Sequence, residues 1–225
     1  MNTEINTLIK GYQKFHEQYY QKKSMLYDTL TRYGQKPKFL IIACSDSRVD
    51  PAIVTNAEPG DLFVIRNVAN LVPPYEKNIN DEEDTTSYHG VSAALEFGVC
   101  ELEVQHIIVF GHSQCGGIGS LFQEHNVTNH QKKFINKWME LACNAHAGTI
   151  KQYAQAPLEE QISTCAHYSL INSLQNLKTF PWIKSRVQNN ALFLHSWYFD
   201  LATGIIDIYD EKNNIFETLR FNELT

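Results

Sequence analysis

The sequence of 225 residues lacks an apolar run long enough to cross a membrane. Its longest runs, such as residues 39–43 and 107–110, fall far below the roughly 20 residues of a membrane-spanning helix. It also lacks an excess of basic residues, since 19 Lys and Arg stand against 25 Asp and Glu and the net charge is -6. Such a charge repels phosphate backbones and anionic lipid surfaces. We therefore expect neither nucleic acid nor membrane as a partner.

The N-terminus has no basic segment followed by an apolar one, so no export signal is visible. Five cysteines, an odd number, are scattered over a chain that is large enough not to need disulfides. These features predict free thiols in a reducing compartment, the cytoplasm. Because 43% of the residues are hydrophobic, the chain can form one sizeable core but scarcely two.

Short apolar runs bounded by turn residues are typical of strands that are buried on both faces. Residues 39–43, 62–65 and 107–110 are such runs, and 191–195 is a fourth. Residues 205–209 follow a Thr-Gly turn and are expected to return as a hairpin partner of the fourth strand.

Apolar residues at spacings of three and four predict helices over 5–19, 91–102 and 158–177. Alternation of strands and helices predicts an α/β fold with a mostly parallel, doubly wound sheet of about four parallel strands plus an antiparallel edge strand. We expect residues 1–33 to form an N-terminal helical arm and residues 34–225 a single α/β domain. The polar, proline-broken stretch 67–88 is expected to form a long loop over a functional face.

The first and third predicted strands end in residues that can bind a metal. Cys44 follows the first strand, and a short turn that contains His112 and Cys115 follows the third. If the strands are neighbours, two thiolates and one imidazole converge, and zinc accepts this set in tetrahedral geometry. Three protein ligands leave a fourth position, which in catalytic zinc sites holds water with a lowered pKa. Two thiolates neutralise the metal charge, so we expect activity to favour alkaline pH.

Asp46 and Arg48 lie on the same connection as Cys44. An aspartate so close to a metal can bind the fourth position and close the site, or it can pair with Arg48 and accept a hydrogen bond from the metal-bound hydroxide. The guanidinium of Arg48 can hold the carboxylate in a bidentate pair, so we expect the second arrangement.

Simpler interpretations exist for each of these residues. Cys44 alone would be a buried structural thiol more often than a ligand, and Asp46 with Arg48 alone would be an ordinary surface ion pair. The glycines after His112 suggest a phosphate-binding loop, but no Lys-Ser or Lys-Thr follows them. A thiolate phosphatase would need its arginine deeper in a phosphate loop than Arg48 lies. The combination of all five residues favours the metal site.

In these motifs the sequence resembles the beta class of carbonic anhydrases. The shared pattern covers roughly residues 35–210 and consists of residues 44–48 (CSDSR), 59–67 (PGDLFVIRN), 93–97 (AALEF), 111–117 (GHSQCGG), Ser173-Leu174 and 195–198 (HSWY).

The resemblance implies a role for each matching residue. It identifies Cys44, His112 and Cys115 as ligands of one zinc ion per subunit, with Asp46 and Arg48 as the catalytic pair. It further implies four substrate-binding residues. The amide of Gln35 hydrogen-bonds the substrate, and the rings of Phe63 and Phe97 form walls of the pocket. Backbone amides near Gly117 also contact the substrate. Phe97 stands where the plant-like branch usually has tyrosine, so the contact of that hydroxyl is lost here.

A bacterial branch of the family closes its site with bicarbonate through a tryptophan, an arginine and a tyrosine. Ile41 stands at the tryptophan position, while Arg66 and Tyr198 match the other two. We therefore expect this regulatory site to be absent or weakened, with Asp46 resting on Arg48.

The resemblance implies reversible hydration of carbon dioxide to bicarbonate and a proton by metal-bound hydroxide. An alternative with the same zinc site is a hydrolase of carbon disulfide or carbonyl sulfide, and a third is a zinc-stabilised scaffold that has lost activity. Family members wrap the N-terminal arm around a second subunit and complete the pocket at that interface. The resemblance therefore implies a homo-oligomer, either a dimer or a tetramer.

Overall fold

The computed structural model describes residues 3–75, 89–123 and 132–220. The chain forms two units, one up to Lys36 and one from Pro37 onward. The part of the predicted loop from residue 76 to residue 88 lies outside the described residues. Within the described ranges, no helix combines the length and the apolar character that crossing a membrane requires.

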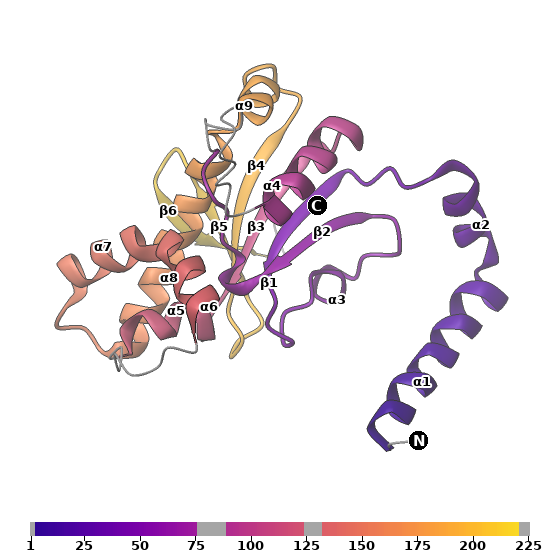
Figure 1. Cartoon of the computed structure of the whole chain (residues 1–225), viewed down its shortest axis with the longest axis horizontal. Helices are drawn as coiled ribbons and strands as arrows, with labels where there is room; N and C mark the ends of the chain where they lie inside the picture. The colour runs from indigo at the N-terminus through magenta and orange to yellow at the C-terminus, as the bar shows by residue number, and fades with distance from the viewer. Residues whose placement is uncertain (1–2, 76–88, 124–131, 221–225) are drawn as a thin grey trace. The chain divides into compact units, whose positions relative to one another are not determined.

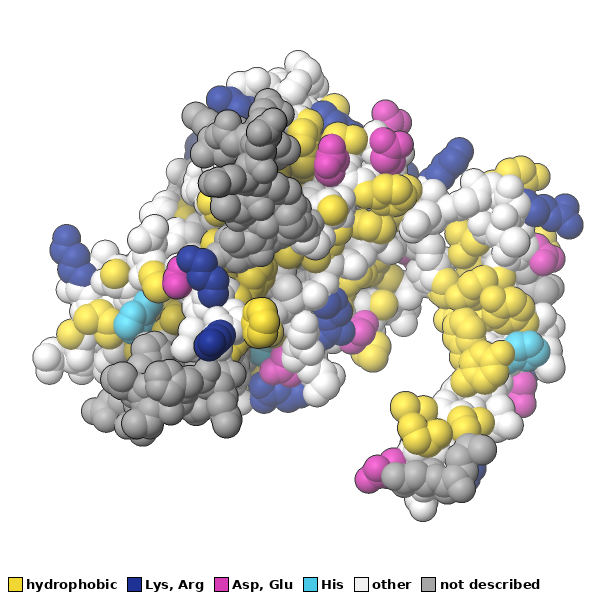
Figure 2. All heavy atoms as spheres, in the orientation of Figure 1, with side chains coloured by type: hydrophobic (Ala, Val, Ile, Leu, Met, Phe, Trp, Pro, Cys, Tyr) yellow, Lys and Arg dark blue, Asp and Glu magenta, His cyan; other side chains and the backbone are white. Residues whose placement is uncertain are grey.

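The N-terminal unit consists of two helices joined by a π-helical turn, which are α1 (Thr3–His16), the turn Glu17–Lys22 and α2 (Ser24–Tyr33). No residue of α1 is buried, and its apolar stripe is open, with Leu8 72% and Tyr12 63% exposed. In Figure 2 hydrophobic side chains gather along one side of this unit. Within the unit, Phe15 near the end of α1 contacts Tyr19 and Tyr27. The rest of the apolar face has no such cover among the described residues of the unit, and an amphipathic helix needs a partner for this face.

The second unit is built on a six-stranded sheet with the order β2-β1-β3-β4-β5-β6. The strands β1 to β4 pair in parallel, and β5 and β6 are antiparallel. The predicted mostly parallel sheet is confirmed, with one more antiparallel strand than expected. The strands, labelled in Figure 1, are β1 (Phe39–Cys44), β2 (Leu62–Asn67), β3 (His106–His112), β4 (Phe193–Phe199), β5 (Ile206–Asp210) and β6 (Ile215–Thr218).

The helices of this unit cover both faces of the sheet. Val54 of α3 packs on the face of Ile41 and Phe110, whereas the other helices with buried side chains pack on the opposite face, around Leu40 and Val109. The longest of them, α8, matches its predicted range. The helices are α3 (Pro51–Thr55), α4 (His89–Glu96), α5 (Gly116–Gly119), α6 (Lys133–Met139), α7 (Cys143–Tyr153), α8 (Leu158–Leu177) and α9 (Pro181–Gln188).

The chain changes direction across the sheet between β1 and β3. From β1 it moves outward to β2, and from β2 it returns past β1 to β3. In an open α/β sheet, ligands bind beyond the carboxyl ends of the strands at such a switch point. The fold therefore points to the ends of β1 and β3, where Cys44 and His112 lie, as the place for a site.

Candidate metal centre

The three predicted metal ligands come together at this switch point. Cys44 is the last residue of β1, His112 is the last residue of β3, and Cys115 precedes α5. β1 and β3 are paired in parallel up to Ala43 and Phe110, so the two strands end at the same edge of the sheet. The register of two buried strands thus brings together residues that are about 70 positions apart in the sequence.

The geometry of this cluster suits a single metal ion. One ligand atom from each of Cys44, His112 and Cys115 lies within 4.8 Å of the others, and the two sulfur atoms are 4.0 Å apart. All three side chains are buried, with residue exposures of 5%, 1% and 3%. A tetrahedral zinc ion with bonds of about 2.0 to 2.3 Å holds its ligand atoms at about such separations.

His112 is oriented as a metal ligand. Its Nδ1 donates a hydrogen bond to the carbonyl oxygen of Ser113 at 2.8 Å, which leaves Nε2 unprotonated. Nε2 is buried and has no hydrogen-bond partner among the described residues. A buried acceptor without a partner costs free energy unless another group satisfies it. The donor set and this orphan nitrogen therefore fit zinc.

The two thiols also behave as a pair that needs a cation. The hydrogen bond with Cys115 lowers the pKa of Cys44 to about 4, and the same contact raises the pKa of Cys115 far above its ordinary value. Two neighbouring acids at this distance do not both ionise readily, because each thiolate repels the other. A divalent ion between the sulfur atoms removes that repulsion and takes the place of the shared proton.

The carboxylate of Asp46 lies beside the cluster, and Arg48 holds it there. Arg48 donates from Nε to Oδ1 at 3.0 Å and from Nη2 to Oδ2 at 2.7 Å, the expected bidentate pair. These bonds hold the pKa of Asp46 well below its usual range. Oδ2 of Asp46 lies 3.8 Å from Nε2 of His112. The carboxylate is thus ionised and lies beside a residue that would hold the metal.

Arg66 fixes the loop that carries Cys44 and Asp46, a role that the sequence analysis missed. Its Nη2 donates to the carbonyl oxygens of Cys44 at 2.8 Å and of Asp46 at 2.7 Å, and Nη1 pairs with Asp50 at 2.8 Å. Asp50 in turn caps α3 through the backbone N–H groups of Ala52 and Ile53. One guanidinium therefore links β1, its following loop and α3.

The substitution Arg66→Lys is expected to loosen this loop. An ammonium group cannot reproduce the planar fork that contacts two carbonyls and a carboxylate at once. Because one or two charge-assisted hydrogen bonds are lost, we expect the free energy of unfolding to fall by about 1 to 3 kcal/mol. Urea unfolding of the two proteins measures this difference. Equal unfolding midpoints and slopes would show that the guanidinium is not needed.

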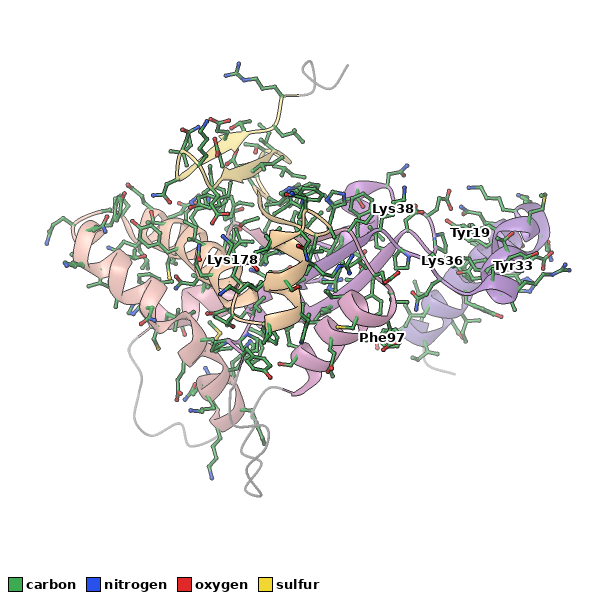
Figure 3. All side chains as sticks on the ribbon, turned by 90° about the horizontal axis from the view of Figure 1, so that it is seen from above. Tyr19, Tyr33, Lys36, Lys38, Phe97 and Lys178 are labelled. Atoms are coloured by element: carbon green, nitrogen blue, oxygen red, sulfur yellow. The ribbon has the colours of Figure 1, made fainter. Side chains whose placement is uncertain are left out.

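The structure places the predicted pocket aromatics away from the cluster of the same chain. Phe63 pairs with Leu40, four residues before Cys44 on β1, which corresponds to about 13 Å along the strand. Its ring centroid is 5.9 Å from that of Phe97. Phe97 is 46% exposed and lies at the surface in Figure 3. The two rings therefore form a pair of their own at the other end of β1.

The other two predicted substrate residues lie in different settings. Gln35 is exposed and belongs to the N-terminal unit. Gly117 lies in the first turn of α5, two residues after Cys115, where a Cβ atom would approach Val68 at 2.9 Å. Among Phe63, Phe97 and Gly117, which belong to the same unit as the metal ligands, Gly117 is the residue next to them.

Tyr198 and Ile41 lie in different cores, on opposite faces of the sheet. The hydroxyl of Tyr198 pairs with that of Ser163 at 3.0 Å and lines a cavity of about 920 Å³ beside Cys115. The described structure does not bring Ile41, Arg66 and Tyr198 together. The absence of the bacterial regulatory site stays a prediction. Asp46 rests on Arg48 in this structure.

Comparisons with known proteins agree with this geometry. The family model described as carbonic anhydrase matches residues 39–206. The chain is 34% identical over 207 residues to beta carbonic anhydrase 3 of Arabidopsis thaliana, which covers 92% of this chain and 77% of the relative. It is 35% identical over 206 residues to the carbonic anhydrase of Synechocystis sp., which covers 92% of this chain and 71% of that protein.

A solved structure shows the same fold. The beta-carbonic anhydrase CcaA superposes with a TM-score of 0.87 at 34% identity, over 96% of this chain and 100% of that chain. The match of the family model includes strands β1 to β4 and the metal cluster. The chain belongs to the carbonic anhydrase family, in its beta class.

Proposed function

We propose that this protein catalyses the reversible hydration of carbon dioxide to bicarbonate and a proton, with one zinc ion held by Cys44, His112 and Cys115. The observation that carries this proposal is the imidazole of His112, whose buried Nε2 has no hydrogen-bond partner in the described residues and which offers a ligand atom within 4.8 Å of two thiols. The relatives named above support the reaction.

The metal and Asp46 have different roles at the site. Zinc, when bound, would act as a Lewis acid that lowers the pKa of water toward 7. Asp46 accepts a hydrogen bond from the attacking water at Oδ2, which turns a lone pair of the water oxygen toward the substrate. Because Arg48 keeps the carboxylate ionised, Asp46 acts as an acceptor that orients water and not as the final proton acceptor. Arg48 acts by holding Asp46 in place.

Metal analysis combined with a stopped-flow hydration assay tests the function. We expect one zinc per chain and rapid proton release from carbon dioxide. Release of hydrogen sulfide from carbon disulfide, measured on the same sample, tests the hydrolase alternative, which the named relatives do not favour. A protein that binds zinc but hydrates carbon dioxide no faster than buffer would contradict the proposal.

A second copy of the chain is proposed to complete the substrate pocket. Phe63 lies about 13 Å along the strand from the metal end of β1, and Phe97 pairs with it, so the two rings do not form a wall against carbon dioxide at their own cluster. The resemblance assigns this role to both rings and assigns the substrate contact to Gln35. An interface that brings these residues to the metal cluster of another copy accounts for both their position in the chain and the role that the resemblance assigns to them. Residues 1–33 form the helical arm of this interface.

The substitution Leu8→Glu on the open stripe of α1 is expected to weaken self-association. Leu8 is 72% exposed within its own chain, and a charge that is buried in an interface costs several kcal/mol. Light scattering should show a dimer or tetramer for the unmodified protein and a shift toward 25.8 kDa for the variant. Asn6→Glu, which adds the same charge outside the stripe, is the control. A monomeric unmodified protein would contradict the expected homo-oligomer.

We also propose that the protein works in the cytoplasm. All five cysteines are free thiols, including the two that are 4.0 Å apart at the metal cluster. A reducing compartment keeps such a pair available for a metal ion.

A further inference from the structure

A tight turn follows β2 and ends beside the metal cluster. Residues 67–71 form it, and it contains two residues with left-handed backbone angles, Ala69 with a φ of 63° and Asn70 with a φ of 49°. Both are buried, with exposures of 1% and 4%. An alanine in this conformation costs free energy of about 1 kcal/mol or more. Such a buried and strained alanine persists because its surroundings hold it there.

The strained residue contacts a metal ligand. The backbone N–H of Ala69 donates to the sulfur of Cys44 at 3.4 Å. A hydrogen bond to a thiolate withdraws charge from the sulfur and fixes its direction, as partners of metal ligands commonly do. The turn that contains the left-handed Ala69 therefore places an N–H group at the sulfur atom of Cys44.

Contacts from three directions hold the turn. The side-chain amide of Asn67 closes it by accepting from the N–H of Leu71 and donating to the carbonyl of Leu71, both at 2.9 Å. Trp138, from α6, donates from Nε1 to the carbonyl of Val68 at 2.8 Å. The turn is therefore fixed at its base by Asn67 and at its outer side by a helix 70 residues further along the chain.

The third contact is with Gly117, where the lack of a side chain lets the turn approach. A Cβ atom at this position would lie 2.9 Å from Cγ1 of Val68 and 3.0 Å from Cβ of Ala69. The side chain of Val68 can rotate away, but the Cβ of Ala69 can move only with its backbone. At the preceding glycine, Gly116, a Cβ atom would meet nothing within 4 Å.

We propose that the turn 67–71 is a positioning element for the metal ion, which presents the Ala69 N–H to the Cys44 sulfur, and that Gly117 and Trp138 set how closely it approaches. The proposal rests on the proposed zinc site and adds positioning residues to it. It gives Gly117 a role in metal binding that is separate from the substrate contact that the resemblance implies.

The substitution Gly117→Ala tests this proposal, with Gly116→Ala as the matched control on the same helix. We expect zinc to bind about 10- to 100-fold more weakly to Gly117→Ala, the usual cost of losing a partner of a metal ligand. Competition with a chromophoric chelator measures the affinity. In the cobalt-substituted proteins the thiolate-to-metal absorption band should shift for Gly117→Ala and stay unchanged for Gly116→Ala.

A second substitution separates the position of the turn from other effects of the new methyl group. In Gly117→Ala/Ala69→Gly, the Cβ of residue 69 that this methyl group would meet is removed, and glycine accepts the φ of 63°. We expect this double variant to regain most of the zinc affinity and the original cobalt spectrum. A double variant as weak as Gly117→Ala would overturn the proposal.

The variant Trp138→Phe covers the case in which Gly117→Ala does not fold. It keeps an aromatic ring and removes the donor to Val68, so we expect a two- to tenfold loss of zinc affinity, about the value of one hydrogen bond. Equal affinities of Trp138→Phe and the unmodified protein, or of Gly117→Ala and Gly116→Ala, would overturn the proposal. If the unmodified protein itself bound no zinc, the proposed function would fail instead.

Discussion

Replacement of His112 by alanine is expected to remove zinc and to abolish the hydration of carbon dioxide. The imidazole supplies the one neutral ligand of the cluster and is 1% exposed. The nearby carboxylate of Asp46 is held by Arg48 in a bidentate pair, so we do not expect it to take the place of the imidazole. Two thiols 4.0 Å apart remain, which is too few ligands for a stable structural or catalytic zinc site. We expect the zinc content to fall from about one per chain to below about one tenth, and the rate to fall by at least about a thousandfold.

Metal analysis after dialysis, followed by the stopped-flow assay, measures both quantities. Cys143→Ser is the matched control, because it removes an exposed thiol that does not belong to the cluster. It should keep its zinc and its rate. A His112→Ala variant that retained stoichiometric zinc would show that the ion is bound elsewhere, and the assignment of all three ligands would be wrong.

The sequence is sufficient to predict the parallel sheet and the metal ligands because both depend on local patterns. Strands such as β1 and β3 are continuous apolar runs, because a parallel strand that is buried on both faces needs apolar side chains at nearly every position. Cys44 and His112 directly end these runs. Once the two strands are neighbours, their ends must meet, so the site follows from the fold without any knowledge of side-chain contacts.

Other elements could not be predicted, because their signals are weak or nonlocal. The strand β6 has only four residues, two of them polar, and no apolar run marks it. Arg66 can fix the loop after β1 because it lies opposite Ala43 in the register of β1 and β2, and the sequence does not reveal this register. The turn at Ala69 carries no glycine to mark its left-handed angles, since tertiary contacts with Gly117 and Trp138 hold it.

The distance between the aromatic pair and the metal ligands could likewise not be predicted from the sequence. Phe63 lies on β2, directly beside the strand of Cys44, and adjacency of strands alone suggests proximity. The register shows instead that it pairs with Leu40, at the opposite end of that strand. A residue can thus lie on a strand that neighbours the strand of Cys44 and still be far from the metal cluster of its own chain.

Replacement of Asp46 by asparagine is expected to lower kcat/KM by about a hundredfold or more while zinc remains bound, because in the proposed function the residue orients water but does not hold the metal. Asparagine keeps the shape of the side chain but turns one acceptor atom into a donor, and it loses the charge that pairs with Arg48 at 2.7 Å.

The pH dependence of the effect distinguishes an Asp46 that orients water from an Asp46 that acts as a titrating base. Because Arg48 holds the pKa of Asp46 well below its usual range, the carboxylate is ionised wherever the enzyme is assayed. The ratio of kcat/KM between the unmodified protein and Asp46→Asn should therefore stay constant from about pH 6 to pH 9. Asp61→Asn, the same chemical change at a position whose carboxylate accepts only from the N–H of Glu58 in the described contacts, should leave kcat/KM unchanged. A ratio that fell steadily as the pH was lowered would identify Asp46 as a proton acceptor and would overturn the orienting role.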